Sequence, residues 1–226
     1  MSALAVLWFF LIFVLIAGYF LLDGFDLGVG VLYRALAKDE RERALVRRSI
    51  GPVWDGNEVW LLTAGGALFA AFPAAYATTF SGFYLAVMLV LFGLIVRAVS
   101  LEFRAHDSQW ARAWDVCFTV GSLLPALLLG VALGNVIAGI PMAANGDYAG
   151  VPLLGLLSPF TLVAGLLGLA MCLSAGAAWV ALKAPAGSAV HMRAAKLRVP
   201  CQVAALVLFA VATVLAFAVV KPVFAP

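Results

Sequence analysis

The stretch GPVWDGNEVWLLTAGGALFAAFPAA, residues Gly51–Ala75, carries Asp55, Asn57 and Glu58 at the start of an apolar segment. Asp55 and Glu58 are three residues apart, so on a helix both carboxylates lie on one face. Ionised carboxylates are costly in a bilayer because burial disfavours the charged form. The stretch therefore predicts a membrane helix that begins with a functional acidic pair.

The composition of the whole chain supports a membrane location. Hydrophobic residues make up 65% and charged residues 11% of the sequence, and the mean hydropathy is +1.11. A soluble domain is about half apolar and about a quarter charged. We therefore expect an integral membrane protein that crosses the bilayer several times. A nucleic-acid partner is not expected.

Six apolar segments each approach or exceed about 20 residues, the length that a spanning helix needs. They run from about Leu4 to Leu22 (with a continuation to Leu32 left open), Trp54 to Phe72, Thr79 to Ser100, Val116 to Ile140, Pro159 to Leu182 and Val199 to Val220. Pro73–Ala75 would form a very tight connection, and Pro125 would kink the fourth span. The expected fold is an all-α polytopic membrane bundle of about six transmembrane helices.

Basic residues predict the orientation of these spans. Of the 14 Lys and Arg residues, 13 fall in alternate loops or at the adjoining helix ends, and Lys221 alone falls on the other side. Cytoplasmic loops carry such an excess of Lys and Arg. The amino terminus is therefore expected outside the membrane.

With this orientation, several charged residues come to the same depth at the inner side of the membrane. They are Asp23, Asp26, Asp55, Glu58, Arg97 and Glu102. Charges at helix ends can be simple anchors, but two acidic pairs and one arginine at one depth favour a functional polar cluster. We expect Arg97 to pair with one or more of the carboxylates.

Small residues mark expected helix contacts, and metal-ligand patterns are missing. Gly65–Gly66 and the GxxxG pair Gly130 and Gly134 would let backbones approach closely. The two histidines, His106 and His191, lie outside every apolar segment, and the sequence has no CxxC or HExxH. We expect no haem or metal to be held by this chain alone.

Five motifs resemble subunit II of the cytochrome bd-type quinol oxidases. They are DGFDLGVG (Asp23–Gly30), PVWDGNEVWLLTAGGALFAAFP (Pro52–Pro73), FSGFY (Phe80–Tyr84), Arg97 and GVALGN (Gly130–Asn135). The resemblance runs in order through nearly the whole chain.

The resemblance implies a haem-free accessory subunit of a terminal respiratory oxidase in the bacterial cytoplasmic (inner) membrane. Its partner, subunit I, would hold haem b and haem d, oxidise quinol and reduce dioxygen to water, and a small extra subunit could be present. This chain would stabilise the haem subunit, contact lipid and quinone, and contribute to proton uptake from the cytoplasm. By motif, Asp26 and Asp55 resemble the acidic proton-path residues of the family, Arg97 matches its inner-end arginine, and Glu102 stands where many relatives have another acid. Glu58, where other members carry Glu or Gln, is expected in the same proton path, and Asp23 and Asn57 complete the polar cluster.

The second subunit in that family usually has eight spans, as two four-helix halves. Residues 1–226 would form a single transmembrane domain, with 1–140 as the first half and 141–226 as part of the second. A truncated reading frame, a shortened form and one part of a split subunit all remain open. Two alternative functions also remain open: a proton-coupled transporter or channel, and a non-functional truncated subunit.

Overall fold

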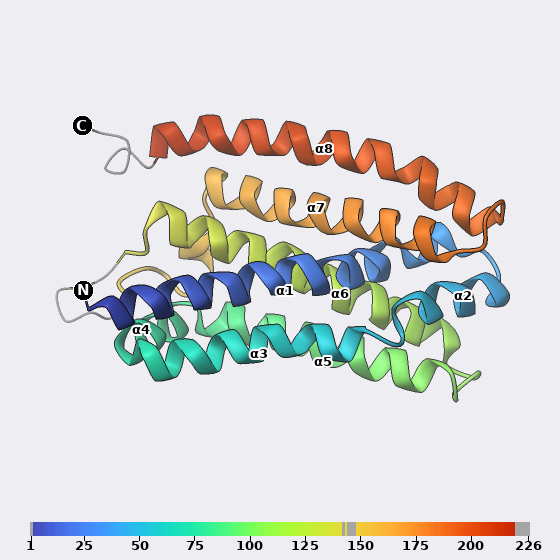
Figure 1. The fold of residues 1–226 in the computed structure, drawn as a ribbon, viewed down its shortest axis with the longest axis horizontal. Helices are drawn as coiled ribbons and strands as arrows, with labels where there is room; N and C mark the ends of the chain where they lie inside the picture. Colours follow the sequence, from blue (N-terminus) through green and yellow to red (C-terminus); the bar gives the residue numbers. More distant parts are fainter. Residues whose placement is uncertain (1, 142, 144–147, 220–226) are drawn as a thin grey trace.

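The computed structural model describes residues 2–141, 143 and 148–219, and these residues form one helical bundle (Figure 1). Lys221 and the end of the predicted sixth span lie outside the described residues. The elements are α1 (Ala3–Leu36), α2 (Glu40–Ile50), α3 (Trp54–Ala71), α4 (Pro73–Gly82), α5 (Tyr84–Arg104), α6 (Ala111–Ala138), the 3-10 turn η1 (Leu154–Leu156), α7 (Pro159–Lys183) and α8 (Ala189–Val219).

The all-α membrane architecture predicted from hydropathy is confirmed. Five helices are long and apolar enough to cross a membrane, namely α1, α5, α6, α7 and α8. The predicted second span is also a helix, α3, but its 18 residues include Asp55 and Glu58 and it is not among those five. The acidic start that marks α3 in the sequence is also what lowers its hydropathy.

The predicted third span differs at its outer end. Thr79 to Ser100 is not one helix, because α4 ends at Gly82 and α5 begins at Tyr84. A very tight connection was predicted at Pro73–Ala75, but these residues lie in α4 and the connection is one residue earlier. Phe72 alone separates α3 from α4, and Pro73 is the first residue of α4. Proline suits this position because its missing N–H would have no helical partner there.

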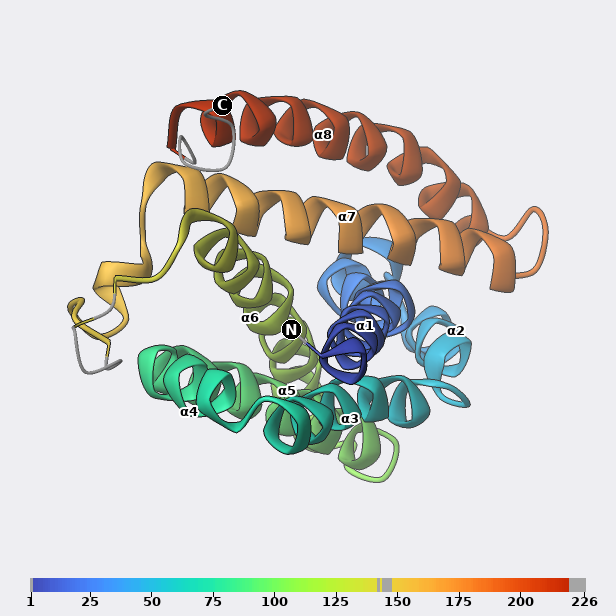
Figure 2. The ribbon, with the colours of Figure 1, turned by 60° about the vertical axis from the view of Figure 1, so that its left-hand side comes forward.

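Helix α1 forms the centre of the bundle. It packs against α3, α6 and α7, while α8 packs chiefly on the outer side of α7 (Figure 2). Gly28 of α1 meets Gly176 of α7 so closely that a Cβ at Gly28 would lie 1.8 Å from the carbonyl oxygen of Cys172. Only glycine permits this contact, which brings two backbones together without side chains between them.

The glycines predicted to mark helix contacts divide into two groups. Gly130 packs against Ala164 and Gly165 of α7, and Gly134 packs against Ala164 as well, so the GxxxG prediction is confirmed as an intramolecular contact. A Cβ at Gly65 or Gly66 would meet nothing within 4 Å in the described structure. The prediction of close packing at this second pair was wrong, because that face of α3 has no neighbour here.

Candidate functional site

The core of the site is an ion pair between Arg97 of α5 and Asp23 of α1. The two guanidinium nitrogens Nη1 and Nη2 donate to Asp23 Oδ2 at 3.0 Å and Oδ1 at 2.7 Å. Both side chains are completely buried. Parallel hydrogen bonds of this kind fix the orientation of both partners as well as pairing their charges. This contact joins α1 to α5, and its two residues are 74 positions apart in the sequence.

Glu58 of α3 brings a second carboxylate to the same arginine. Its Oε1 lies 3.4 Å from Arg97 Nη1, and its side chain is 22% exposed. This oxygen accepts no hydrogen bond from the described residues. Arg97 therefore ties α3 to the α1–α5 pair through a looser contact than the one with Asp23.

Asp26 lies one helical turn after Asp23 and contacts α3 through Asn57. The amide nitrogen of Asn57 donates to Asp26 Oδ2 at 2.7 Å and to the carbonyl oxygen of Leu22 at 3.3 Å. The other oxygen of Asp26, Oδ1, is buried and has no hydrogen-bond partner among the described residues. A buried carboxyl oxygen without a partner is costly unless it binds water or a proton.

Tyr19 adds a hydroxyl group that was not predicted from the sequence. It lies one turn before Asp23 on α1, is 1% exposed, and its hydroxyl has no hydrogen-bond partner in the part of the chain that the structure describes. The i, i+4 spacing from Asp23 could have drawn attention to it. We call Tyr19, Asp23, Asp26, Asn57, Glu58 and Arg97 the buried cluster.

The charges of the buried cluster do not balance if every carboxyl group is ionised. Three carboxyl groups face one guanidinium group. Asp23 forms the tight pair with Arg97, which leaves Asp26 and Glu58 without a cation of their own. In a low-dielectric interior, excess negative charge favours uptake of a proton. The cluster therefore holds more carboxyl groups than its one guanidinium group can neutralise.

Two of the residues expected in the cluster lie outside it. Asp55 and Glu102 are both exposed. Asp55 occupies the first turn of α3, and Glu102 the last turn of α5, so neither reaches the Arg97 contacts. The i, i+3 spacing of Asp55 and Glu58 puts them near one helix face, but only Glu58 contacts Arg97 of α5.

A second group of charges, not anticipated from the sequence, gathers at the end of the bundle near α2. Arg104 of α5 donates from Nε to Asp115 Oδ1 of α6 at 2.8 Å and also pairs with Glu40 of α2. Arg43 Nη1 lies 3.2 Å from Asp115 Oδ2, and Arg47 Nη2 lies 3.2 Å from Glu40 Oε1. These five residues, the α2 ionic network, fasten α2 across the ends of α5 and α6.

Two glutamates of α2 show the electrostatic effect of such contacts. At Glu40, slight burial opposes ionisation, but hydrogen bonds from Arg104 and Arg47 lower the pKa below its ordinary value. At Glu42, the hydrogen bond from Arg193 of α8, supported by the backbone N–H of Lys38, lowers the pKa. Both carboxylates therefore favour the folded arrangement when they are ionised.

Both histidines lie within hydrogen-bonding distance of a backbone carbonyl oxygen. The Nδ1 atom of His106 lies 3.1 Å from the carbonyl oxygen of Glu102, and that of His191 lies 2.8 Å from the carbonyl oxygen of Ala181. Both lie outside the buried cluster. Among the described residues, no group of three or more His, Cys, Asp or Glu side chains is arranged to hold a metal ion.

Fold and site together define an all-α, multi-pass membrane protein with a buried charge cluster between its helices. The chain belongs to the family described as cytochrome bd terminal oxidase subunit II, whose profile matches residues 4–226.

Relatives of known name agree with this assignment. The chain is 42% identical over 212 residues to cytochrome bd-I ubiquinol oxidase subunit 2 of Escherichia coli (strain K12), covering 91% of this chain and 54% of the relative. It is 46% identical over 147 residues to cytochrome bd ubiquinol oxidase subunit 2 of Bacillus subtilis (strain 168), covering 64% and 44%. The chain thus spans about half the length of the curated relatives it matches.

A solved structure supports the fold. The chain superimposes on a chain of the bd oxidase from Geobacillus thermodenitrificans with a TM-score of 0.72, covering 92% of this chain and 66% of that one. The sequence identity is 19%, so this likeness bears on the fold alone.

Proposed function

We propose that this chain is an accessory subunit of a membrane quinol oxidase that reduces dioxygen to water. In this proposal a partner subunit holds the haems and oxidises quinol, and this chain stabilises that partner. It also contributes a route for protons taken from the cytoplasm. The family membership supports the oxidase assignment, and the buried cluster supports the proton route.

The observation that carries the proton route is the imbalance of charge around Arg97. Asp23 is held in a two-point ion pair, while Asp26 keeps a buried oxygen without a partner and Glu58 makes only a 3.4 Å contact. A fixed ion pair beside two loosely held carboxyl groups suits proton transfer. The pair sets the local field, and the other two groups change protonation without dismantling the site.

The positions of the carboxyl groups suggest the direction of proton transfer. Asp55 and Glu102 are exposed near the end of the bundle that carries most of the basic residues, where the cytoplasm is expected. They would collect protons at the surface. Glu58 and Asp26 would then pass them inward, with water completing the hydrogen-bonded chain, and Asn57 would hold Asp26 in place through its 2.7 Å hydrogen bond.

The stabilising role has support from the exposed surface of the bundle. Large apolar side chains are exposed on several helices, among them Leu62 at 70%, Phe92 at 61% and Leu206 at 68%. Lipid would cover some of these side chains, and a partner subunit would cover others.

The assignment is tested by isolating the chain from cells that also produce the neighbouring haem subunit. A tag on this chain is used for purification in mild detergent, and the reduced-minus-oxidised visible spectrum and quinol-driven oxygen uptake are recorded. Co-purified haem bands with oxygen uptake are the expected result. A folded, helical preparation without haem and without a partner would overturn the oxidase assignment.

A further inference from the structure

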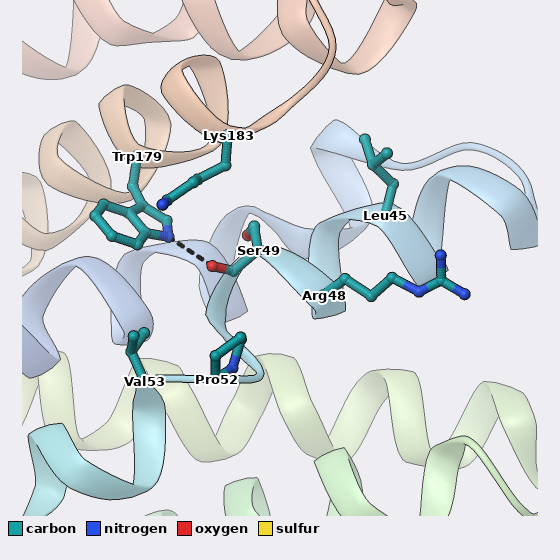
Figure 3. Close-up of a pocket in the computed structure, with 7 residues that line it drawn as sticks. All are labelled: Leu45, Arg48, Ser49, Pro52, Val53, Trp179 and Lys183. Atoms are coloured by element: carbon teal, nitrogen blue, oxygen red, sulfur yellow. Dashed lines mark hydrogen bonds between the residues drawn. The ribbon is translucent and has the colours of Figure 1, made fainter.

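A pocket at the α2 end of the bundle lies apart from the buried cluster. It is lined by Leu45, Arg48, Ser49, Pro52, Val53, Trp179 and Lys183, and its volume is about 250 Å³. Its walls come from α2, from the turn that leads into α3, and from the last turns of α7 (Figure 3). The proposed function leaves this pocket without a role.

The indole of Trp179 forms a fixed wall of the pocket. Its Nε1 donates to the carbonyl oxygen of Ser49 at 2.9 Å, and its ring stacks on Phe25 of α1 with centroids 4.1 Å apart. An indole held between an apolar partner and a polar one is typical of the membrane interface. The pocket thus lies where lipid headgroups are expected.

Two cations of the pocket have no anionic partner in the described structure. Lys183 is exposed, and its ammonium nitrogen lies 4.8 Å from the centre of the Trp179 ring. Arg48 is exposed as well, and its stem lines the pocket while its guanidinium group extends away from Lys183 (Figure 3). An exposed arginine changes rotamer at little cost, so this group can turn toward a ligand beside Lys183.

The neighbouring arginines differ from Arg48 and Lys183 because each of them has an anionic partner. Arg43, Arg47, Arg104 and Arg193 each pair with a carboxylate. Arg48 and Lys183 have no such carboxylate partner among the described residues. Both lie in the last turn of a helix, where the negative end of the helix dipole favours a cation. The negative helix end weakens the attraction of each cation for an anion, so anion binding needs both cations together.

We propose that this pocket binds the phosphate of an anionic phospholipid in the inner leaflet. Lys183 and Arg48 would contact the phosphate oxygens, and Leu45, Pro52 and Val53 would contact the glycerol and the upper acyl chains. Basic pockets between membrane helices on the cytoplasmic side suit such headgroups. The proposal requires that the chain spans a membrane with its α2 end at the cytoplasmic face, and it does not depend on the oxidase role.

The test compares two double variants of the protein as purified with its partners. Arg48→Gln with Lys183→Gln removes both pocket cations. Arg41→Gln with Arg198→Gln removes two exposed cations outside the pocket, one on α2 and one on α8. Native mass spectrometry titrates phosphatidylglycerol, phosphatidylcholine of the same acyl chains, and inorganic phosphate.

The pocket variant should bind phosphatidylglycerol about thirtyfold more weakly, since each basic residue near an anionic surface contributes about one kilocalorie per mole. The control variant should bind like the wild type, and a further variant, Lys183→Arg, should retain binding. Equal phosphatidylglycerol affinity in the two double variants would overturn the proposal. So would equal binding of phosphatidylcholine, or displacement of the lipid by inorganic phosphate at matching concentration. Circular dichroism checks that the helices remain intact.

Discussion

Removing the cation of the buried cluster should be the most damaging single change in the bundle. In Arg97→Met, Asp23 loses both hydrogen bonds, at 3.0 and 2.7 Å, and Glu58 loses its 3.4 Å contact. Asp23 is completely buried and cannot exchange the lost partner for bulk water. Breaking one side of a buried pair costs about 3–5 kcal/mol, a large part of a typical stability of about 5–15 kcal/mol.

The assay is thermal unfolding followed by fluorescence-detected size-exclusion chromatography, with yield measured in parallel. For a chain of this size the loss corresponds to a melting temperature lower by about 10 °C. Asp55→Asn serves as a control because Asp55 is exposed, and its melting temperature should stay close to that of the wild type. Adding Asp23→Leu to Arg97→Met removes the stranded carboxylate and should restore part of the loss. Equal stability of Arg97→Met and Asp55→Asn would refute this reasoning.

Three further substitutions test the proton route, the helix packing and a surface ion pair, one each. Asp55→Asn should lower oxygen-reduction turnover several-fold with haem content retained, as measured by oxygen electrode and visible spectrum, and full turnover would remove Asp55 from the proton route. Gly28→Ala should cost about 1–3 kcal/mol or more, because its Cβ would lie 1.8 Å from a backbone oxygen of α7, whereas Gly65→Ala should be neutral in the same unfolding assay. The contact with Arg193 lowers the pKa of Glu42 in the folded protein. The contact therefore stabilises the fold at pH values above the ordinary glutamate pKa of about 4.3. This stabilisation is lost as the pH falls through the lowered pKa of the folded state. The difference in melting temperature between the wild type and Glu42→Gln should therefore shrink from about pH 6 to about pH 3, and a constant difference would contradict the contact.

Hydropathy predicted most of the helices because each spanning helix must bury its own backbone hydrogen bonds in an apolar segment. The predicted start at Pro159 agrees with α7, and the predicted start at Trp54 agrees with α3. The break at Phe83 was missed, because no proline or charged residue stands near it to mark a helix end. The bounds of α2 were also not predicted, since its charged residues carry no hydropathy signal.

The buried cluster was predictable in part. The acidic pairs and Arg97 were found because charges inside apolar segments stand out. The pairing itself was not predicted, because Arg97 and Asp23 are 74 residues apart in sequence. Only the packing of α1 and α5 against α6 decides which carboxylate Arg97 meets. The α2 ionic network was missed for a similar reason. Arg104 and Glu40 are 64 residues apart, and each resembles an ordinary loop charge when read alone.

The measurement that bears most directly on the proposed function is proton uptake by Asp26→Asn. The oxidase complex is reconstituted in vesicles, and proton uptake and quinol-driven oxygen consumption are followed together at equal haem content. The control, Asp107→Asn, removes a carboxylate between α5 and α6 that accepts a hydrogen bond from Trp114 and lies outside the buried cluster. The proposal predicts that Asp26→Asn slows both rates while Asp107→Asn leaves both unchanged. Wild-type rates in a fully assembled Asp26→Asn complex would contradict a proton route through the buried cluster.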